Sequence, residues 1–79
     1  MFKWLKRKPK FKIAFAQIIN TITFTIELFE VDSLYYWGAT DNDNILHQYL
    51  SPQYKTYEEA KEHLGDFINY VESSTYGNY

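Results

Sequence analysis

The chain has 79 residues, a formal net charge of −2 and no cysteine. Its length leaves room for one hydrophobic core, which excludes an active site between two domains of this chain. The lack of cysteine excludes disulfides, thiolate metal sites, iron–sulfur clusters and cysteine nucleophiles. Eight Tyr, six Phe and two Trp supply apolar area instead, so we expect a dense aromatic core.

The N-terminal residues form a basic arm. Residues 1–12 carry six Lys or Arg side chains and no acid, whereas residues 13–79 carry two Lys and ten acids. We therefore expect an arm of residues 1–10 joined to an acidic body. The cations and apolar side chains of the arm together suit contact with an anionic membrane surface or a nucleic-acid backbone. The residues that would make this contact are Lys3, Trp4, Lys6, Arg7 and Lys8.

Two long strands are predicted after the arm. Residues 11–19 alternate apolar with small or charged side chains, which is the period of a half-buried strand. In residues 21–28 a row of Thr and Glu side chains alternates with a row of Ile, Phe and Leu side chains. Asn20 and Thr21 supply the reversal between the two strands.

A second pair of strands follows a turn at residues 32–33. Residues 34–37 predict a third strand that ends at Gly38. The polar run 40–44 predicts a loop, because its Asp and Asn side chains favour turns. A short fourth strand is expected over residues 45–50.

A C-terminal helix is predicted from about Tyr57 to Ser73. Thr56 and Glu59 have the spacing of a capping box, and an apolar stripe then runs along one side of the helix. The sequence therefore predicts an α+β fold, an antiparallel sheet of three or four strands packed by one helix. We expect a single domain of residues 11–73, followed by a flexible tail of residues 74–79.

No pattern in the sequence indicates catalysis or a metal site. His47 and His63 stand at no recognisable spacing from each other or from a nucleophile, so we expect both to be ordinary surface or boundary residues. Residues 41–44 lack the glycine and the terminal Glu of a calcium loop. The three glycines are scattered and form no phosphate cradle. The sequence thus predicts a protein without enzymatic activity, metal or cofactor.

Two surfaces are candidate contacts for a partner protein. The first is an acidic surface on the helix, extended by acids of the polar loop, and a solvated face remains its ordinary interpretation. The second is the third strand, because one helix covers only one face of a sheet and leaves aromatic rings on the other. An exposed strand also allows a homodimer, in which two copies of the chain pair through that strand. The candidate residues are Glu58, Glu59, Glu62, Asp66, Asp41, Asp43, Tyr35, Tyr36 and Trp37.

In size, charge and architecture the whole chain resembles the small inhibitors that bacteriophages encode against host defences, anti-CRISPR proteins among them, without matching a family motif. The resemblance implies stoichiometric binding to a host nucleic-acid-processing or defence complex, and it assigns no role to any residue. The alternative is a peripheral membrane- or nucleic-acid-associated accessory protein that uses the basic arm. We expect a cytoplasmic location, since no secretion signal or membrane-spanning run is present.

Overall fold

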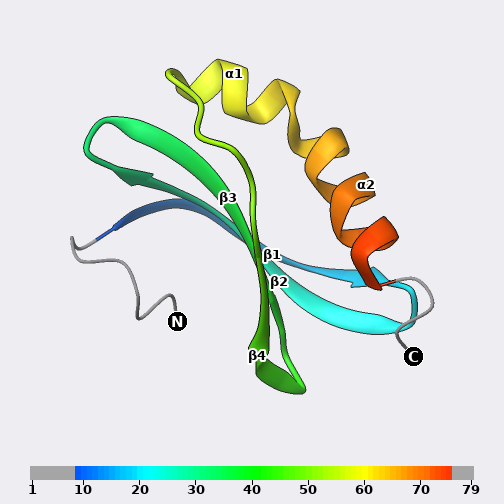
Figure 1. The fold of residues 1–79 in the computed structure, drawn as a ribbon. Helices are drawn as coiled ribbons and strands as arrows, with labels where there is room; N and C mark the ends of the chain where they lie inside the picture. The colour runs from blue at the N-terminus through cyan, green and yellow to red at the C-terminus, as the bar shows by residue number, and fades with distance from the viewer. Residues whose placement is uncertain (1–8, 76–79) are drawn as a thin grey trace.

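The computed structural model describes residues 9–75 (Figure 1). The predicted arm up to residue 8 and the last four residues of the predicted tail lie outside this range. Four antiparallel strands form one open sheet in the order β1-β2-β3-β4, and two helices follow, which confirms the predicted α+β class. The elements are β1 (Lys10–Ile19), β2 (Ile22–Val31), β3 (Leu34–Asp41), β4 (Asn44–Leu50), α1 (Tyr57–Glu62) and α2 (Leu64–Thr75).

Tight turns join the first three strands at the predicted reversals. Asn20 and Thr21 have φ angles of 50° and 67°, and Asp32 and Ser33 have 53° and 66°. Two successive residues with positive φ characterise the type I′ turn, whose twist matches that of the flanking strands. Each reversal therefore directs its two strands into an antiparallel hairpin.

The third strand is longer than the sequence predicts. β3 continues through Gly38 to Asp41, and the predicted polar loop of residues 40–44 is reduced to a turn at residues 42–43. The reason is pairing with β2, which lies opposite every residue of β3 from Leu34 onward. Hydrogen bonds to a long neighbouring strand thus outweigh the low strand propensity of Gly and Asp. The expected fourth strand is present as β4.

The hydrophobic core lies between the sheet and the helices. Phe24, Ile26 and Leu28 of β2 have no exposed surface. Phe67 and Val71, from the predicted apolar stripe, belong to the same cluster. The helical region therefore packs through the side that the sequence predicted. None of the helices within residues 9–75 is long and apolar enough to cross a membrane.

A buried tryptophan divides the helical region in two. Trp37 is 1% exposed, and its indole Nε1 donates a hydrogen bond of 2.6 Å to the carbonyl oxygen of Ala60. The same oxygen accepts the N–H of His63 at 3.2 Å, a spacing of three residues instead of the four of an α-helix. The chain turns at His63, so that α1 and α2 point in different directions (Figure 1).

Both ends of the helical region are capped. At its start, the Thr56 hydroxyl accepts the N–H of Glu59 at 3.1 Å, as the predicted capping box requires. At its end, the side-chain amide of Asn20 donates to the Glu72 carbonyl at 2.8 Å and to the Thr75 hydroxyl at 2.9 Å. α2 therefore includes the first two residues of the tail that the sequence predicted to be flexible, and Thr75 is buried.

We expect Trp37→Phe to lower the free energy of unfolding by about 1 to 3 kcal/mol, because the smaller ring underfills the core and removes the indole donor from Ala60. Denaturant unfolding followed by circular dichroism measures the change. Tyr36→Phe is the control: it removes an exposed hydroxyl that bonds Gln53 at 3.0 Å, and it should cost less than about 0.5 kcal/mol. Equal losses in the two variants would contradict the role given to the indole bond.

The carboxyl of Glu27 should make stability depend on pH. Glu27 is 5% exposed, and burial raises the pKa of its carboxyl above the ordinary 4.5. Just above pH 4.5 the folded protein therefore holds a proton that the unfolded chain has released, so this contribution to stability is lost as pH rises through the raised pKa. We expect Glu27→Gln to remove this component from a plot of unfolding free energy against pH. Superimposable profiles for the two proteins would refute the shift.

Candidate functional site

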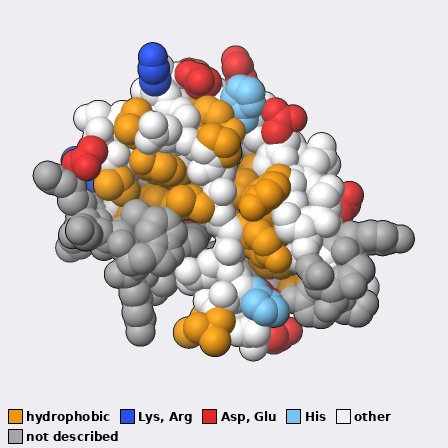
Figure 2. Space-filling view, viewed as in Figure 1, with side chains coloured by type: hydrophobic (Ala, Val, Ile, Leu, Met, Phe, Trp, Pro, Cys, Tyr) orange, Lys and Arg blue, Asp and Glu red, His pale blue; other side chains and the backbone are white. Residues whose placement is uncertain are grey.

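An open groove of about 660 Å³ lies between the end of β4 and the helices. Apolar and aromatic side chains line most of it, and His63 and Asp66 add polar groups. Figure 2 shows apolar side chains exposed on one side of the molecule, with acidic side chains and a histidine along the upper edge. The apolar and aromatic lining residues are Leu50, Pro52, Tyr54, Phe67 and Tyr70.

Backbone pairing with β3 fixes the wall of the groove that follows β4. The N–H of Ser51 donates to the Trp37 carbonyl at 2.8 Å, and the Ser51 hydroxyl accepts the Trp37 N–H at 2.8 Å. Three residues later, Tyr54 and Tyr35 exchange two backbone hydrogen bonds of 2.8 Å each. The Tyr54 side chain is therefore held in place by the sheet, although it lies outside the strands.

His63 and Asp66 form a pair at the junction of the two helices. Nδ1 of His63 lies 2.9 Å from Oδ2 of Asp66, and the imidazole stacks on the Tyr54 ring with centroids 4.9 Å apart. Burial, followed by the negative charges of Asp66 and Glu59, raises the pKa of the Tyr54 phenol. The carboxylates of Asp66 and Glu59 thus lie close enough to the groove to raise the pKa of the Tyr54 phenol in its wall.

A His–Asp pair is also part of many hydrolytic sites, where the imidazole activates a nucleophile. Within residues 9–75, no side-chain hydrogen bond joins the His63 ring to a hydroxyl. The Ser51 hydroxyl on the groove wall is engaged by the Trp37 N–H and by the Pro52 carbonyl, the latter at 2.8 Å. The same residues contain no group of three His, Asp or Glu side chains placed to hold a metal ion. Apolar and aromatic side chains next to the carboxylate of Asp66 are thus the main groups that the groove presents.

The acids predicted on one helix face are distributed over two helices. Glu58, Glu59 and Glu62 are exposed on α1, and Asp66 is exposed on α2, beyond the turn at the helix junction. Asp66 lines the groove, and the negative charge of Glu59 raises the pKa of the Tyr54 phenol. Glu58 instead lies 3.6 Å from the ammonium of Lys61. The acids therefore differ in their relation to the groove, which the helical period did not indicate.

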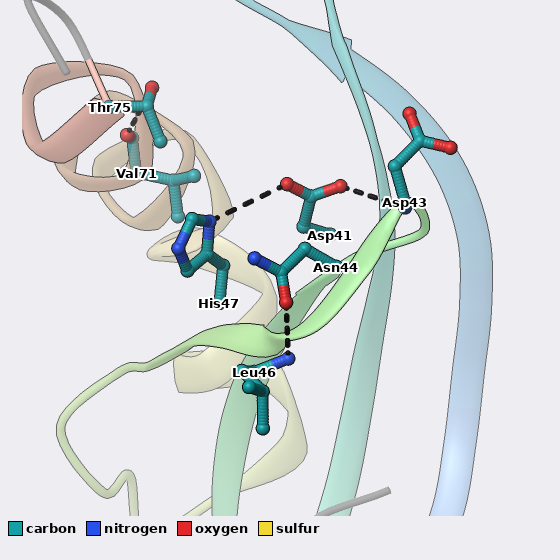
Figure 3. Close-up of polar contacts among 7 residues, drawn as sticks. All are labelled: Asp41, Asp43, Asn44, Leu46, His47, Val71 and Thr75. Atoms are coloured by element: carbon teal, nitrogen blue, oxygen red, sulfur yellow. Dashed lines mark hydrogen bonds and ion pairs between the residues drawn. The ribbon is translucent and has the colours of Figure 1, made fainter. Parts of the chain in front are cut away.

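The two acids predicted to extend this surface lie at the opposite end of the molecule, in the β3–β4 hairpin (Figure 1). Asp41 is 3% exposed, and its carboxylate accepts the backbone N–H of Asp43 at 2.9 Å and lies 3.7 Å from Nδ1 of His47 (Figure 3). Asp43 is exposed in the turn. The Asp41 carboxylate, predicted to extend the acidic surface, is therefore buried and engaged within the hairpin.

The three aromatic residues of β3 do not form one surface. Trp37, predicted as a contact residue, is buried in the core. Tyr35 faces the helices and packs against Tyr57, with ring centroids 6.2 Å apart. Tyr36 faces away from the helices and stacks on Phe29 at 5.6 Å. The sheet therefore separates Tyr36 from Tyr35 and Trp37, as the alternation of side chains along a strand requires.

The groove was not predicted from the sequence. Tyr54, His63 and Tyr70 come from three segments, and no spacing relates the first of them to the others. One signal was available: Tyr70 follows Phe67 by three residues, which places its ring beside the apolar stripe of the helix. The alternative contact residues of the basic arm, Lys3, Trp4, Lys6, Arg7 and Lys8, lie outside the described residues.

Comparisons of the chain with protein-family models, with curated proteins and with solved structures found no match.

We expect Asp66→Asn to lower the pKa of the Tyr54 phenol, because the neutral amide no longer opposes the negative charge of the phenolate. The ring signals of Tyr54 followed by NMR through the alkaline range measure this pKa. Glu58→Gln is the matched control, since Glu58 is an exposed helical acid paired with Lys61. An equal shift in both variants would indicate a general charge effect instead of a local one.

Proposed function

We propose that this chain is a non-catalytic protein-binding module whose groove holds a partner segment with an apolar side chain next to Lys or Arg. The observation that carries the proposal is the combination of an aromatic groove with acidic groups at one end, at Asp66 and Glu59. The apolar lining favours an apolar side chain, and the carboxylates favour a cation beside it.

The two parts of the site contribute differently. Burying one apolar side chain in the groove is worth roughly 1.5 to 3 kcal/mol, so the aromatic lining supports affinity. Exposed ion pairs are each worth about 1 kcal/mol or less, so the acids support orientation and the rate of association. Tyr70 is 51% exposed in the free protein and offers the largest ring area for a partner to cover.

Within this class, we extend the proposal to a stoichiometric inhibitor of a nucleic-acid-processing or defence complex. Surfaces that bind nucleic acid carry Lys and Arg that contact phosphates. A competitor for such a surface needs carboxylates in place of phosphates together with a contact that adds affinity. The acids of α1 and α2 beside an apolar groove support this assignment.

The partner can be identified through the groove itself. A photo-crosslinking phenylalanine derivative is placed in the full-length protein at position 70, in the groove, or at position 46, an exposed site on β4 outside it. We expect a protein to be captured from position 70 and not from position 46. The cross-linked peptide should carry Lys or Arg next to an apolar residue. Equal capture from both positions would argue against the groove as the contact.

We expect Tyr70→Ser to weaken binding of that partner at least about tenfold, which corresponds to about 1.4 kcal/mol, because a central aromatic contact is lost. Leu46→Ser is the control, since Leu46 is 86% exposed and does not line the groove. Calorimetric titration measures both affinities, and circular dichroism verifies the fold. The proposal would be abandoned if Leu46→Ser weakened binding as much as Tyr70→Ser.

Reversing the acids near the groove should slow association. The double variant Glu59→Lys and Asp66→Lys is compared with Asp43→Lys and Glu72→Lys, which changes the net charge equally at exposed acids away from the groove. We expect a lower association rate for the first variant at low salt, and a smaller difference at high salt because exposed charges are screened. Equal association rates for the two double variants would show that the groove acids do not contact the partner and form an ordinary solvated surface.

A further inference from the structure

The side of the sheet that faces away from the helices has the properties of a binding surface. Residues directly opposite each other in a ladder share a face, and both helices pack on the face that contains Leu28 and Trp37 (Figure 1). We call the other side the open face. Its residues include Phe11, Ala14, Ala16, Glu27, Phe29, Tyr36 and Gly38.

A row of three rings crosses the open face near the start of β1. Phe11 lies opposite Phe29, with ring centroids 5.8 Å apart, and Phe29 stacks on Tyr36 at 5.6 Å and an interplanar angle of 14°. Phe29 is completely buried, whereas Phe11 is 45% exposed. Phe11 therefore offers most of the exposed apolar area of the row to further aromatic side chains.

Glu27 lies next to this aromatic row. Its neighbours across the ladders are Ala14 on β1 and Gly38 on β3, and neither has a side chain that can hydrogen-bond to the Glu27 carboxyl. The 5% exposure of Glu27 is small for an acid, and a buried carboxylate is costly unless a cation or a hydrogen-bond donor pairs with it. The open face therefore favours an occupant with both aromatic and cationic groups.

We propose that the chain's own residues 1–8 bind the open face, with Phe2, Trp4 and Leu5 on the aromatic row and a cation of the same segment beside Glu27. The segment Met1-Phe2-Lys3-Trp4-Leu5-Lys6-Arg7-Lys8 has the required composition, four cations and three large apolar residues besides Met1, and no acid. Its charge is complementary to Glu27.

The position and length of the segment agree with this assignment. The described chain starts at Pro9, and β1 brings Phe11, two residues later, into the aromatic row. Eight extended residues span up to about 26 to 29 Å. The four strands of the sheet are about 14 Å wide at roughly 4.8 Å between neighbours, so the segment can cross all of them. A second copy on the same face would bring two Glu27 carboxyls together, which like-charge repulsion opposes.

The lack of cysteine allows one spin label to be placed in the full-length protein without interference. Ala16→Cys carries the label on the open face, and Ser73→Cys carries it at an exposed position of α2 in the helical layer. We expect the amide signals of residues 2–5 and the Trp4 indole signal to lose most of their NMR intensity with the label at position 16, and to keep it with the label at position 73.

A mixed sample separates the segment from a second copy. Spin-labelled protein without isotope is combined with isotope-labelled protein without the spin label, and we expect no loss of intensity there. Loss in the mixed sample alone would assign the open face to a second molecule and overturn the proposal. Full intensity at both label positions in the free protein would overturn it as well, and would leave the basic residues for an external partner such as a membrane or a nucleic acid.

The carboxylate is tested with two variants of the same strand, both carrying the label at position 16. Glu27→Gln should restore part of the intensity of residues 2–5, because the cation loses its partner. Glu30→Gln, three residues further along β2 on the helix-facing side, removes an acid that lies 3.6 Å from Lys12 and should leave the intensities unchanged. Equal intensities in the two variants would refute the role of Glu27.

Discussion

The hydrogen bond between the Trp37 indole and the Ala60 carbonyl determines how the helical layer is built. An indole N–H that is removed from water needs an acceptor, and a carbonyl oxygen has two lone pairs and can accept two bonds. The Ala60 carbonyl accepts both the indole N–H and the N–H of His63, which lies three residues ahead instead of the four of an α-helix. Ala60 is completely buried and has a small side chain, so its backbone can lie against the tryptophan. The helix ends there, and the chain continues in a new direction after His63.

The groove follows from this interruption. The turn between α1 and α2 places His63 where its ring stacks on Tyr54, which the sheet holds through its backbone bonds with Tyr35. A continuous helix would carry its residues past β4 at one constant inclination. The change of direction separates α1 from α2, and Asp66 in the first turn of α2 then lies at the groove. One buried hydrogen bond therefore connects the core to the proposed binding site.

The two faces of the sheet meet different requirements. On the helical side, aromatic and aliphatic side chains form the single core that a chain of 79 residues without disulfides needs. On the open face, the aromatic row and Glu27 lie against no helix. In the proposed arrangement the groove serves a partner, whereas the open face binds residues 1–8 and thereby adds buried apolar area to a small domain.

Local patterns in the sequence determined the strands of period two, the reversals at residues 20–21 and 32–33, the Thr56 cap and the apolar side of the helical region. These features depend on neighbouring residues, and the local signals agreed with one another. The extension of β3 through Gly38, the break of the helix at His63 and the burial of Asp41 were decided by the tertiary structure. Each of these features depends on a contact with a residue more than 15 positions away or across a hairpin turn. The periodicity of neighbouring residues does not reveal such a contact.

The candidate site also has features that local sequence patterns determined and features that only packing decided. The exposed acids of the helices could be read from the sequence, because charge and helical period are local properties. The groove required Tyr54, His63 and Tyr70 to come together from three segments, and the burial of Trp37 removed a predicted contact residue from the surface. Residue types in the sequence show which side chains are able to bind a partner. Packing decides which of them remain accessible, because a ring that completes the core no longer reaches the solvent.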